Sequence, residues 1–125
     1  MKTIKEQKTN TIIVNKSKFI AIALPLNSSD DFKEILKPIT KEHRKATHIV
    51  YAYRSNNQSK STDDGEPKGT AGHPILDFLY KKELNNIAII VIRYFGGTKL
   101  GASYLLRTYL QAAIDVINLC EIIEL

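Results

Sequence analysis

The chain has 125 residues, 43% of them hydrophobic and 25% charged, which suits one globular domain and is short for two. A single cysteine, Cys120, excludes an internal disulfide and a four-cysteine zinc site, so a reducing compartment fits best. Residues 1–60 hold 12 Lys/Arg against 5 Asp/Glu and residues 61–125 hold 6 against 8, so the basic half either attracts a polyanion such as RNA or is simply solvated.

The first 45 residues predict a β-hairpin followed by a helix. Apolar runs at residues 11–14 and 18–24 flank a short polar turn, as in an antiparallel hairpin. Ser28 or Ser29 can cap the helix, whose apolar positions share one face: Phe32, Ile35, Leu36 and Ile39. Pro38 predicts a kink or break because it lacks the N–H that would bond back one turn. If the helix continues, four lysines form a basic ridge: Lys33, Lys37, Lys41 and Lys45.

The remaining residues predict two more strands and two more helices. Residues 46–53 alternate as a strand, and the polar stretch 54–60 is interpreted as a mobile loop. Residues 74–84 and 103–119 carry helical apolar stripes. Between those helices lies the unbroken apolar run 87–93, typical of a central strand covered on both faces or nearly so.

The order ββαβαβα predicts an α+β fold, and we expect residues 1–125 to form one domain. The expected architecture is a two-layer α/β sandwich, with a four-stranded mixed sheet and its helices mainly on one face. The N-terminus lacks the apolar segment of a secretory signal, and the longest strictly apolar run, residues 87–92, is far shorter than the roughly 20 residues that span a bilayer. We therefore expect a cytoplasmic protein with no membrane partner.

The first loop that composition does not explain is acidic. Residues 62–72 contain Asp63, Asp64 and Glu66 together with three glycines and Thr70. Clustered carboxylates repel one another and favour a nearby cation. Three interpretations remain open: a structural turn, pairing with basic residues of the same chain, and metal binding.

The second loop, 94–101, is rich in glycine and joins the central strand to the last helix. Gly96, Gly97 and Gly101 leave backbone N–H groups free at a helix N-terminus, which favours an anion. Gly96 and Gly101 have the spacing of a phosphate-binding loop, but Ala102-Ser103 follows in place of Lys-Ser or Lys-Thr, so an ordinary nucleotide triphosphatase is rejected.

Three cations accompany the second loop and could oppose the acidic residues. Arg93, Lys99 and Arg107 would then form one site with the acidic loop, either an internal salt-bridge cluster or a ligand site. Arg107 is expected near the start of the last helix, where a cation is disfavoured without an anionic partner. His48 is interpreted as a core residue and His73 as a better-placed proton carrier, while Cys120 lies on the buried helix stripe.

Four ordered motifs resemble the signature of the IMPACT family, specifically its bacterial YigZ-like branch. They are Ala46-Thr47-His48, Tyr51-Ala52-Tyr53, the stretch from Asp63-Asp64-Gly65-Glu66-Pro67 to Pro74-Ile75-Leu76, and the stretch from Arg93-Tyr94-Phe95-Gly96-Gly97 to Lys99-Leu100-Gly101. The resemblance implies a fold like domain 2 of ribosomal protein S5. The chain departs from the family pattern after Gly101, where Ala102-Ser103-Tyr104 replaces paired glycines.

The resemblance also shapes the functional hypotheses. Eukaryotic members act in translational control by competing for an activator of the amino-acid-starvation kinase. Bacterial members commonly carry a second, ferredoxin-like domain that is thought to bind nucleic acid. We expect that second domain to be absent from residues 1–125. The leading hypothesis is a non-enzymatic regulator of translation that binds RNA, the ribosome or a translation-related protein, with no cofactor. The alternative is a Mg-dependent enzyme acting on a phosphorylated small molecule or nucleotide between the two loops. The third hypothesis is purely structural: charged loops that lock the fold.

Overall fold

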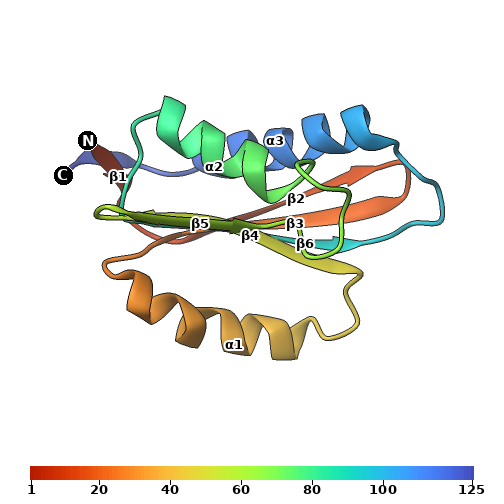
Figure 1. The fold of residues 1–125 in the computed structure, drawn as a ribbon, viewed down its shortest axis with the longest axis horizontal. Helices are drawn as coiled ribbons and strands as arrows, with labels where there is room; N and C mark the ends of the chain where they lie inside the picture. Colours follow the sequence, from red (N-terminus) through yellow and green to blue (C-terminus); the bar gives the residue numbers. More distant parts are fainter.

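A five-stranded antiparallel sheet forms the middle of the protein in the computed structural model, which describes residues 1–125 (Figure 1). The spatial order of the strands is β2-β3-β6-β4-β5, and every neighbouring pair is antiparallel. Their bounds are β2 Lys8–Val14, β3 Ser17–Pro25, β4 His48–Ser55, β5 Gln58–Thr62 and β6 Ile87–Tyr94. The fold is α+β, as expected, but the prediction of a four-stranded mixed sheet is wrong in strand number and in direction.

The extra strand is β5, and the stretch 54–60 interpreted as a mobile loop is the end of β4, a two-residue turn and the start of β5. The chain turns at Asn56-Asn57, where Asn56 takes a positive φ of 55°, and then pairs back from Ser55↔Gln58 to Tyr51↔Thr62. Asparagine suits such a turn because its short polar side chain tolerates the left-handed region. The strand has no apolar alternation because it lies at the sheet edge, where its side chains are exposed or half-buried.

Strand β6 is the central strand, and its apolar run is covered on both faces, as predicted. Ile87, Ile89 and Val91 pack into a core beneath α2 and α3, whereas the alternate residues Ile90 and Ile92 pack into a second core against α1. Because successive side chains of a strand point to opposite faces, an unbroken apolar strand requires cover on both sides. Two cores therefore share this one strand.

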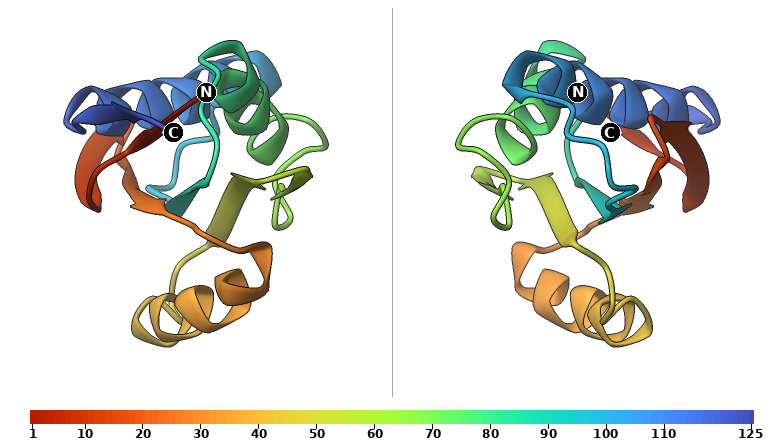
Figure 2. Two further views of the ribbon diagram at one scale, coloured as in Figure 1. Left: turned by 90° about the vertical axis from the view of Figure 1, so that its left-hand side faces the viewer. Right: turned by 90° about the vertical axis from the view of Figure 1, so that its right-hand side faces the viewer.

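The helices lie on both sides of the sheet, so the molecule has three layers and the expected two-layer sandwich is wrong. Helices α2 (Gly72–Lys81) and α3 (Ala102–Asn118) cover one face, and α1 (Phe32–Glu42) covers the other alone (Figures 1 and 2). A 3₁₀ turn, Ser29–Asp31, precedes α1, and Ser28 caps it by accepting a hydrogen bond from the Asp30 N–H at 3.2 Å. Helix α1 continues through Pro38, so the predicted break does not occur.

A small second sheet brings the two ends of the chain together. Strand β1 (Lys2–Ile4) pairs with β7 (Ile122–Glu124), and the Leu125 N–H donates to the Met1 carbonyl at 3.0 Å. The two termini lie side by side near the end of α3 (Figure 2). None of the three helices combines the length and apolar character that crossing a bilayer requires.

Candidate functional site

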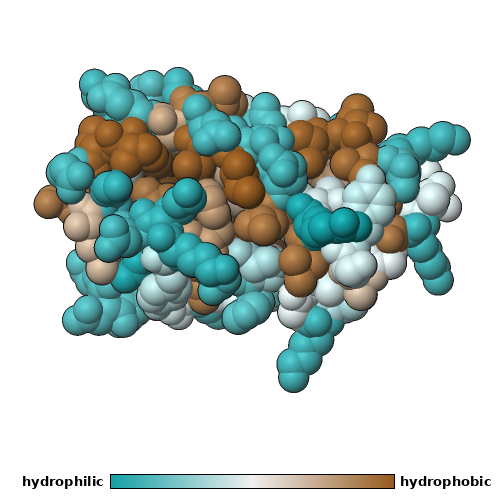
Figure 3. Space-filling model, turned by 90° about the horizontal axis from the view of Figure 1, so that it is seen from above, coloured by the Kyte–Doolittle hydropathy of each residue, from teal (hydrophilic) through white to brown (hydrophobic).

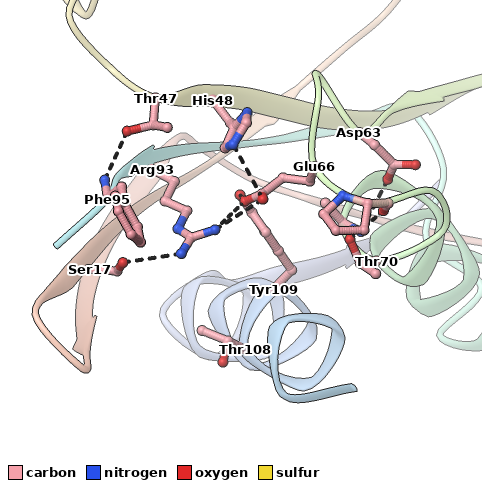
Figure 4. A network of polar contacts seen from close by, with 12 residues as sticks. Ser17, Thr47, His48, Asp63, Glu66, Thr70, Arg93, Phe95, Thr108 and Tyr109 are labelled. Atoms are coloured by element: carbon pink, nitrogen blue, oxygen red, sulfur yellow. Dashed lines mark hydrogen bonds and ion pairs between the residues drawn. The ribbon is translucent and has the colours of Figure 1, made fainter. Parts of the chain in front are cut away.

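The acidic and glycine-rich loops lie over the same end of the sheet, and one buried carboxylate connects the elements around them (Figure 4). Glu66, 7% exposed, accepts two hydrogen bonds from the Arg93 guanidinium, at 3.0 Å on Oε1 and 2.7 Å on Oε2. The Tyr109 hydroxyl donates to Oε2 at 2.5 Å. Glu66 comes from the acidic loop, Arg93 from the end of β6 and Tyr109 from α3, so this carboxylate ties the loop to both a strand and a helix.

His48 completes the cluster at the start of β4. Its Nδ1 lies 2.6 Å from the Asp64 carbonyl oxygen, and its Nε2 lies 3.3 Å from Glu66 Oε1. A carbonyl oxygen only accepts, so Nδ1 carries the hydrogen of the contact with Asp64. His48 therefore ties the start of β4 to the acidic loop, and its ring places Nε2 beside the Glu66 carboxylate.

Tyr109 is held in its neutral, proton-donating form. Burial raises the pKa of its phenol far above the ordinary value, and the hydrogen bond to Glu66 and the negative charge of Glu66 raise it further, against a smaller opposing effect of Arg93. The ring also packs edge to face on Phe19, with the ring centroids 5.2 Å apart. The hydroxyl therefore remains a donor to the carboxylate through the physiological pH range.

Asp63 organises the rest of the acidic loop through backbone hydrogen bonds. Its carboxylate accepts from the N–H groups of Gly69 (2.8 Å), Ala71 (3.1 Å) and Gly72 (2.9 Å), the last of which begins α2. Glycine is required at position 72 because a Cβ there would collide with the Thr62 carbonyl oxygen. The Asp63 carboxylate therefore does for α2 what an N-cap side chain usually does, although Asp63 lies nine positions before the first residue of the helix.

The other polar residues of the acidic loop also have partners within the protein. The Asp64 carboxylate accepts from the Ile49 N–H at 2.7 Å, and the buried Thr70 hydroxyl donates to the Pro67 carbonyl at 2.5 Å. The three carboxylates point to different partners and do not converge on one point. Of the three interpretations of this loop, the geometry matches both the structural turn and pairing with basic residues.

The glycine-rich loop is anchored at its first residues and exposed beyond them. The Phe95 N–H donates to Thr47 Oγ1 at 2.9 Å and the Gly96 N–H donates to Ser17 Oγ at 3.2 Å. Glycine is required at position 96 because a Cβ there would collide with the Lys16 carbonyl group. Gly97 and Gly101 have positive φ values of 96° and 78° in open space, and Gly101 is the uncapped N-terminus of α3.

The three cations expected to oppose the acidic loop separate in the structure. Arg93 is 5% exposed and reaches Glu66, and its Nη2 also lies 3.3 Å from Ser17 Oγ. Lys99 and Arg107 are exposed and pair with no carboxylate. Arg107 lies over the Tyr104 ring at 5.5 Å, so of its two possible anionic partners, the acidic loop and a ligand, the acidic loop does not pair with it in this structure.

His48 and Tyr109 are the members of the cluster that the sequence did not identify. His48 is opposite Arg93 in the β4–β6 register, so both side chains lie on the same face of the sheet, toward the acidic loop. That register was the signal available, but it requires knowing that these strands are neighbours. His73, the expected proton carrier, is exposed on α2 away from the cluster, and Cys120 is only half-buried.

A groove of about 760 Å³ lies between α2 and α3 on the outer side of that helix layer, where Figure 3 shows hydrophobic side chains gathered. Leu106, Leu110 and Ile114 line it from α3, and Phe78 lines it from α2. The three α3 residues recur every four positions outside the stripe that faces the sheet, which is the pattern that could have predicted the groove.

Comparisons with known proteins agree with the fold and the motifs. Residues 15–117 match the family described as the Impact N-terminal domain. The IMPACT family member YvyE of Bacillus subtilis is 38% identical over 98% of this chain and 58% of its own length, and the IMPACT family member YigZ of Escherichia coli is 33% identical over 77% and 50%. A crystal structure of a hypothetical protein superposes with a TM-score of 0.92 at 27% identity, covering 98% of this chain and 62% of that one. The chain thus spans half or slightly more of the length of these two curated relatives, and it belongs to the IMPACT family.

Proposed function

We propose that the chain is a regulator of translation that works as a binding module in the cytoplasm, using the exposed half of the glycine-rich loop and the start of α3. The observation that carries the proposal is the separation of charges at the site. The carboxylates of the acidic loop have partners within the protein, whereas Lys99 and Arg107 remain exposed and without a carboxylate partner. The exposed side of the site is therefore available to an anionic partner.

The loop geometry adds to this electrostatic argument. Gly101 is the N-cap of α3 and provides no side-chain cap, so the N–H groups of the first turn are left for solvent or a ligand at the positive end of the helix dipole. The Glu66 cluster and the two anchored N–H groups hold the base of the loop in place, so little ordering is needed on binding. Membership of the IMPACT family, whose eukaryotic members act in translational control, supports RNA, the ribosome or a translation-related protein as the partner.

Sedimentation through a sucrose gradient tests this proposal. The tagged protein is run with a bacterial lysate at low and at moderate salt, beside a Lys99→Ala/Arg107→Ala variant. We expect the wild type to migrate with ribosomal particles, less so as salt rises, and the variant to stay near the top. The matched control is Lys2→Ala/Lys82→Ala, which removes two exposed lysines outside both loops and should migrate as the wild type. A wild-type protein that stays at the top at both salt concentrations contradicts the proposal.

The alternative from the sequence, a Mg-dependent enzyme acting on a phosphorylated compound, has less support from the geometry. A magnesium site would need carboxylates free to coordinate, and those of Asp63, Asp64 and Glu66 already accept hydrogen bonds from the protein. A rise in thermal midpoint with nucleotides or sugar phosphates that requires Mg²⁺, and that Asp64→Asn abolishes, would move this alternative to first place.

A further inference from the structure

The outer surface of α1 carries a row of lysines that the site described above does not use. Lys33, Lys37 and Lys41 recur every four residues and are all exposed. The spacing places them on one side of the helix, each about 40° around and about 6 Å along from the last. The row is continuous because α1 does not break at Pro38. Arg44 and Lys45, both exposed, extend the same positive surface beyond the helix end.

None of these lysines forms an ion pair within the protein. The ion pairs of the chain involve Lys5, Lys8, Lys81, Arg93 and two histidines, and none involves a lysine of α1. Like charges four residues apart on a helix repel and weaken it. The row therefore lowers the stability of α1 slightly unless an anion lies against it.

The chemistry of this surface fits a phosphate backbone better than a protein or a membrane. Every large hydrophobic residue that is exposed lies outside α1, so the helix offers none of the apolar or aromatic anchors that concentrate the energy of protein interfaces. Its apolar residues, including Phe32 and Ile35, pack against the sheet, so it also lacks the free apolar face of a helix that lies in a membrane surface. Evenly spaced cations without anchors favour repeated, sequence-independent contacts with phosphates.

We propose that the lysine row of α1, defined as Lys33, Lys37 and Lys41, binds the phosphate backbone of RNA without regard to sequence. The row lies on the opposite side of the sheet from α3 and its N-terminal loop (Figure 2). The proposal rests on the proposed function in taking RNA of the translation machinery as the partner, and it adds a second surface to the glycine-rich loop. One molecule then holds RNA on its α1 side while the loop remains free for a further contact.

Fluorescence anisotropy with a labelled single-stranded RNA of 20 mixed nucleotides tests the assignment. The test variant is Lys33→Gln/Lys37→Gln/Lys41→Gln, because glutamine keeps the helix propensity of lysine. Losing three phosphate contacts should reduce the slope of log K against log[salt] by about 2 and weaken binding roughly 10- to 100-fold near 0.1 M salt. Circular dichroism should show an unchanged fold.

The matched control and the sedimentation assay separate the possible outcomes. Lys2→Gln/Lys68→Gln/Lys82→Gln removes the same charge from exposed positions outside α1 and should change binding by less than about threefold. An equal loss in the control, a wild type that does not bind the RNA, or binding to anionic lipid vesicles in place of RNA would overturn the proposal.

If the α1 variant still migrates with ribosomal particles while the Lys99→Ala/Arg107→Ala variant does not, the inference fails and the proposed function stands. If the wild type binds the RNA through α1 but does not migrate with particles, the inference stands and the proposed function fails.

Discussion

Replacing Glu66 by glutamine tests whether the buried cluster holds the two loops in place. The substitution keeps the shape of the side chain and removes its charge. In the folded protein the Arg93 guanidinium, 5% exposed, would lose a partner that now accepts two of its hydrogen bonds. If the amide N–H₂ took the place of Oε2, it would also face the Tyr109 hydroxyl, which now donates to that oxygen.

The magnitude follows from burial and from the number of bonds. Removing one partner of a buried ion pair typically costs about 3–5 kcal/mol, because the remaining charge is desolvated and unpaired. For a domain of 125 residues this corresponds to a fall in thermal midpoint of roughly 10–20 °C.

Urea unfolding at neutral pH, followed by circular dichroism, measures the effect. The control is Glu34→Gln on α1, an exposed residue without an ion pair, which should change the free energy of unfolding by less than about 0.5 kcal/mol. Adding Arg93→Met to Glu66→Gln should restore part of the loss, since no unpaired charge then remains. A Glu66→Gln loss below about 1 kcal/mol, or a double variant that is simply the sum of the singles, would refute this reasoning.

Three further predictions concern the same end of the sheet. Because the pKa of Tyr109 is raised only in the folded state, its phenol favours folding below about pH 10, and the unfolding free energy should fall above that pH by about 1.4 kcal/mol per unit; urea melts from about pH 9 to 11 should show a shallower fall in Tyr109→Phe. Asp63→Ala removes the acceptor of three N–H groups and should cost about 2–4 kcal/mol, whereas Asp63→Asn keeps one acceptor oxygen and should cost less, with hydrogen exchange of those amides as the measurement. Gly96→Ala places a Cβ against the Lys16 carbonyl and should lower the thermal midpoint more than Gly97→Ala does. The Cβ of Gly97→Ala meets no atom within 4 Å, so that variant carries only the strain of its positive φ, about 1–2 kcal/mol. Equal midpoints would contradict this account.

The sequence predicted the helices and strands whose apolar residues follow a clear helical or strand pattern. The last helix was expected at residues 103–119 and runs from Ala102 to Asn118, and the central strand was expected at 87–93 and runs from Ile87 to Tyr94. Strand β5 was missed because its polar side chains lie at the sheet edge, where hydrogen bonds to β4 define the strand and packing does not. Strands β1 and β7 are three residues each, too short for any period to show.

The larger error was to expect two layers where the structure has three, and the residues of β6 already indicated three. Periodicity identifies the face of α1 that packs on the sheet but not which side of the sheet it covers. The alternation within β6 does: Ile89 and Ile90 are both fully buried although they point in opposite directions. A strand buried in this way requires helices on both sides, so the two-layer expectation conflicted with the sequence itself.

For the site, the sequence identified the charges but could not choose among them. Arg93, Lys99 and Arg107 were equal candidates for the cation that meets the acidic loop, and tertiary structure decided in favour of the one at the end of a buried strand. Tyr109 falls within the apolar stripe of residues 103–119, and its ring does pack into the core. Its hydroxyl gained a role only because the acidic loop folds over that part of α3.

The position of β6 also determines the order in which the chain can fold. The β2–β3 and β4–β5 hairpins form from neighbouring residues, but they do not pair with each other, and β6 is inserted between them. During synthesis from the N-terminus, both hairpins leave the ribosome before β6, so the edges of β3 and β4 that later pair with β6 are open and the apolar faces are incomplete. The five-stranded sheet can close only after residue 94 has emerged. A nascent chain that stalls earlier therefore presents two separate hairpins with exposed apolar faces and unpaired strand edges, which favour aggregation.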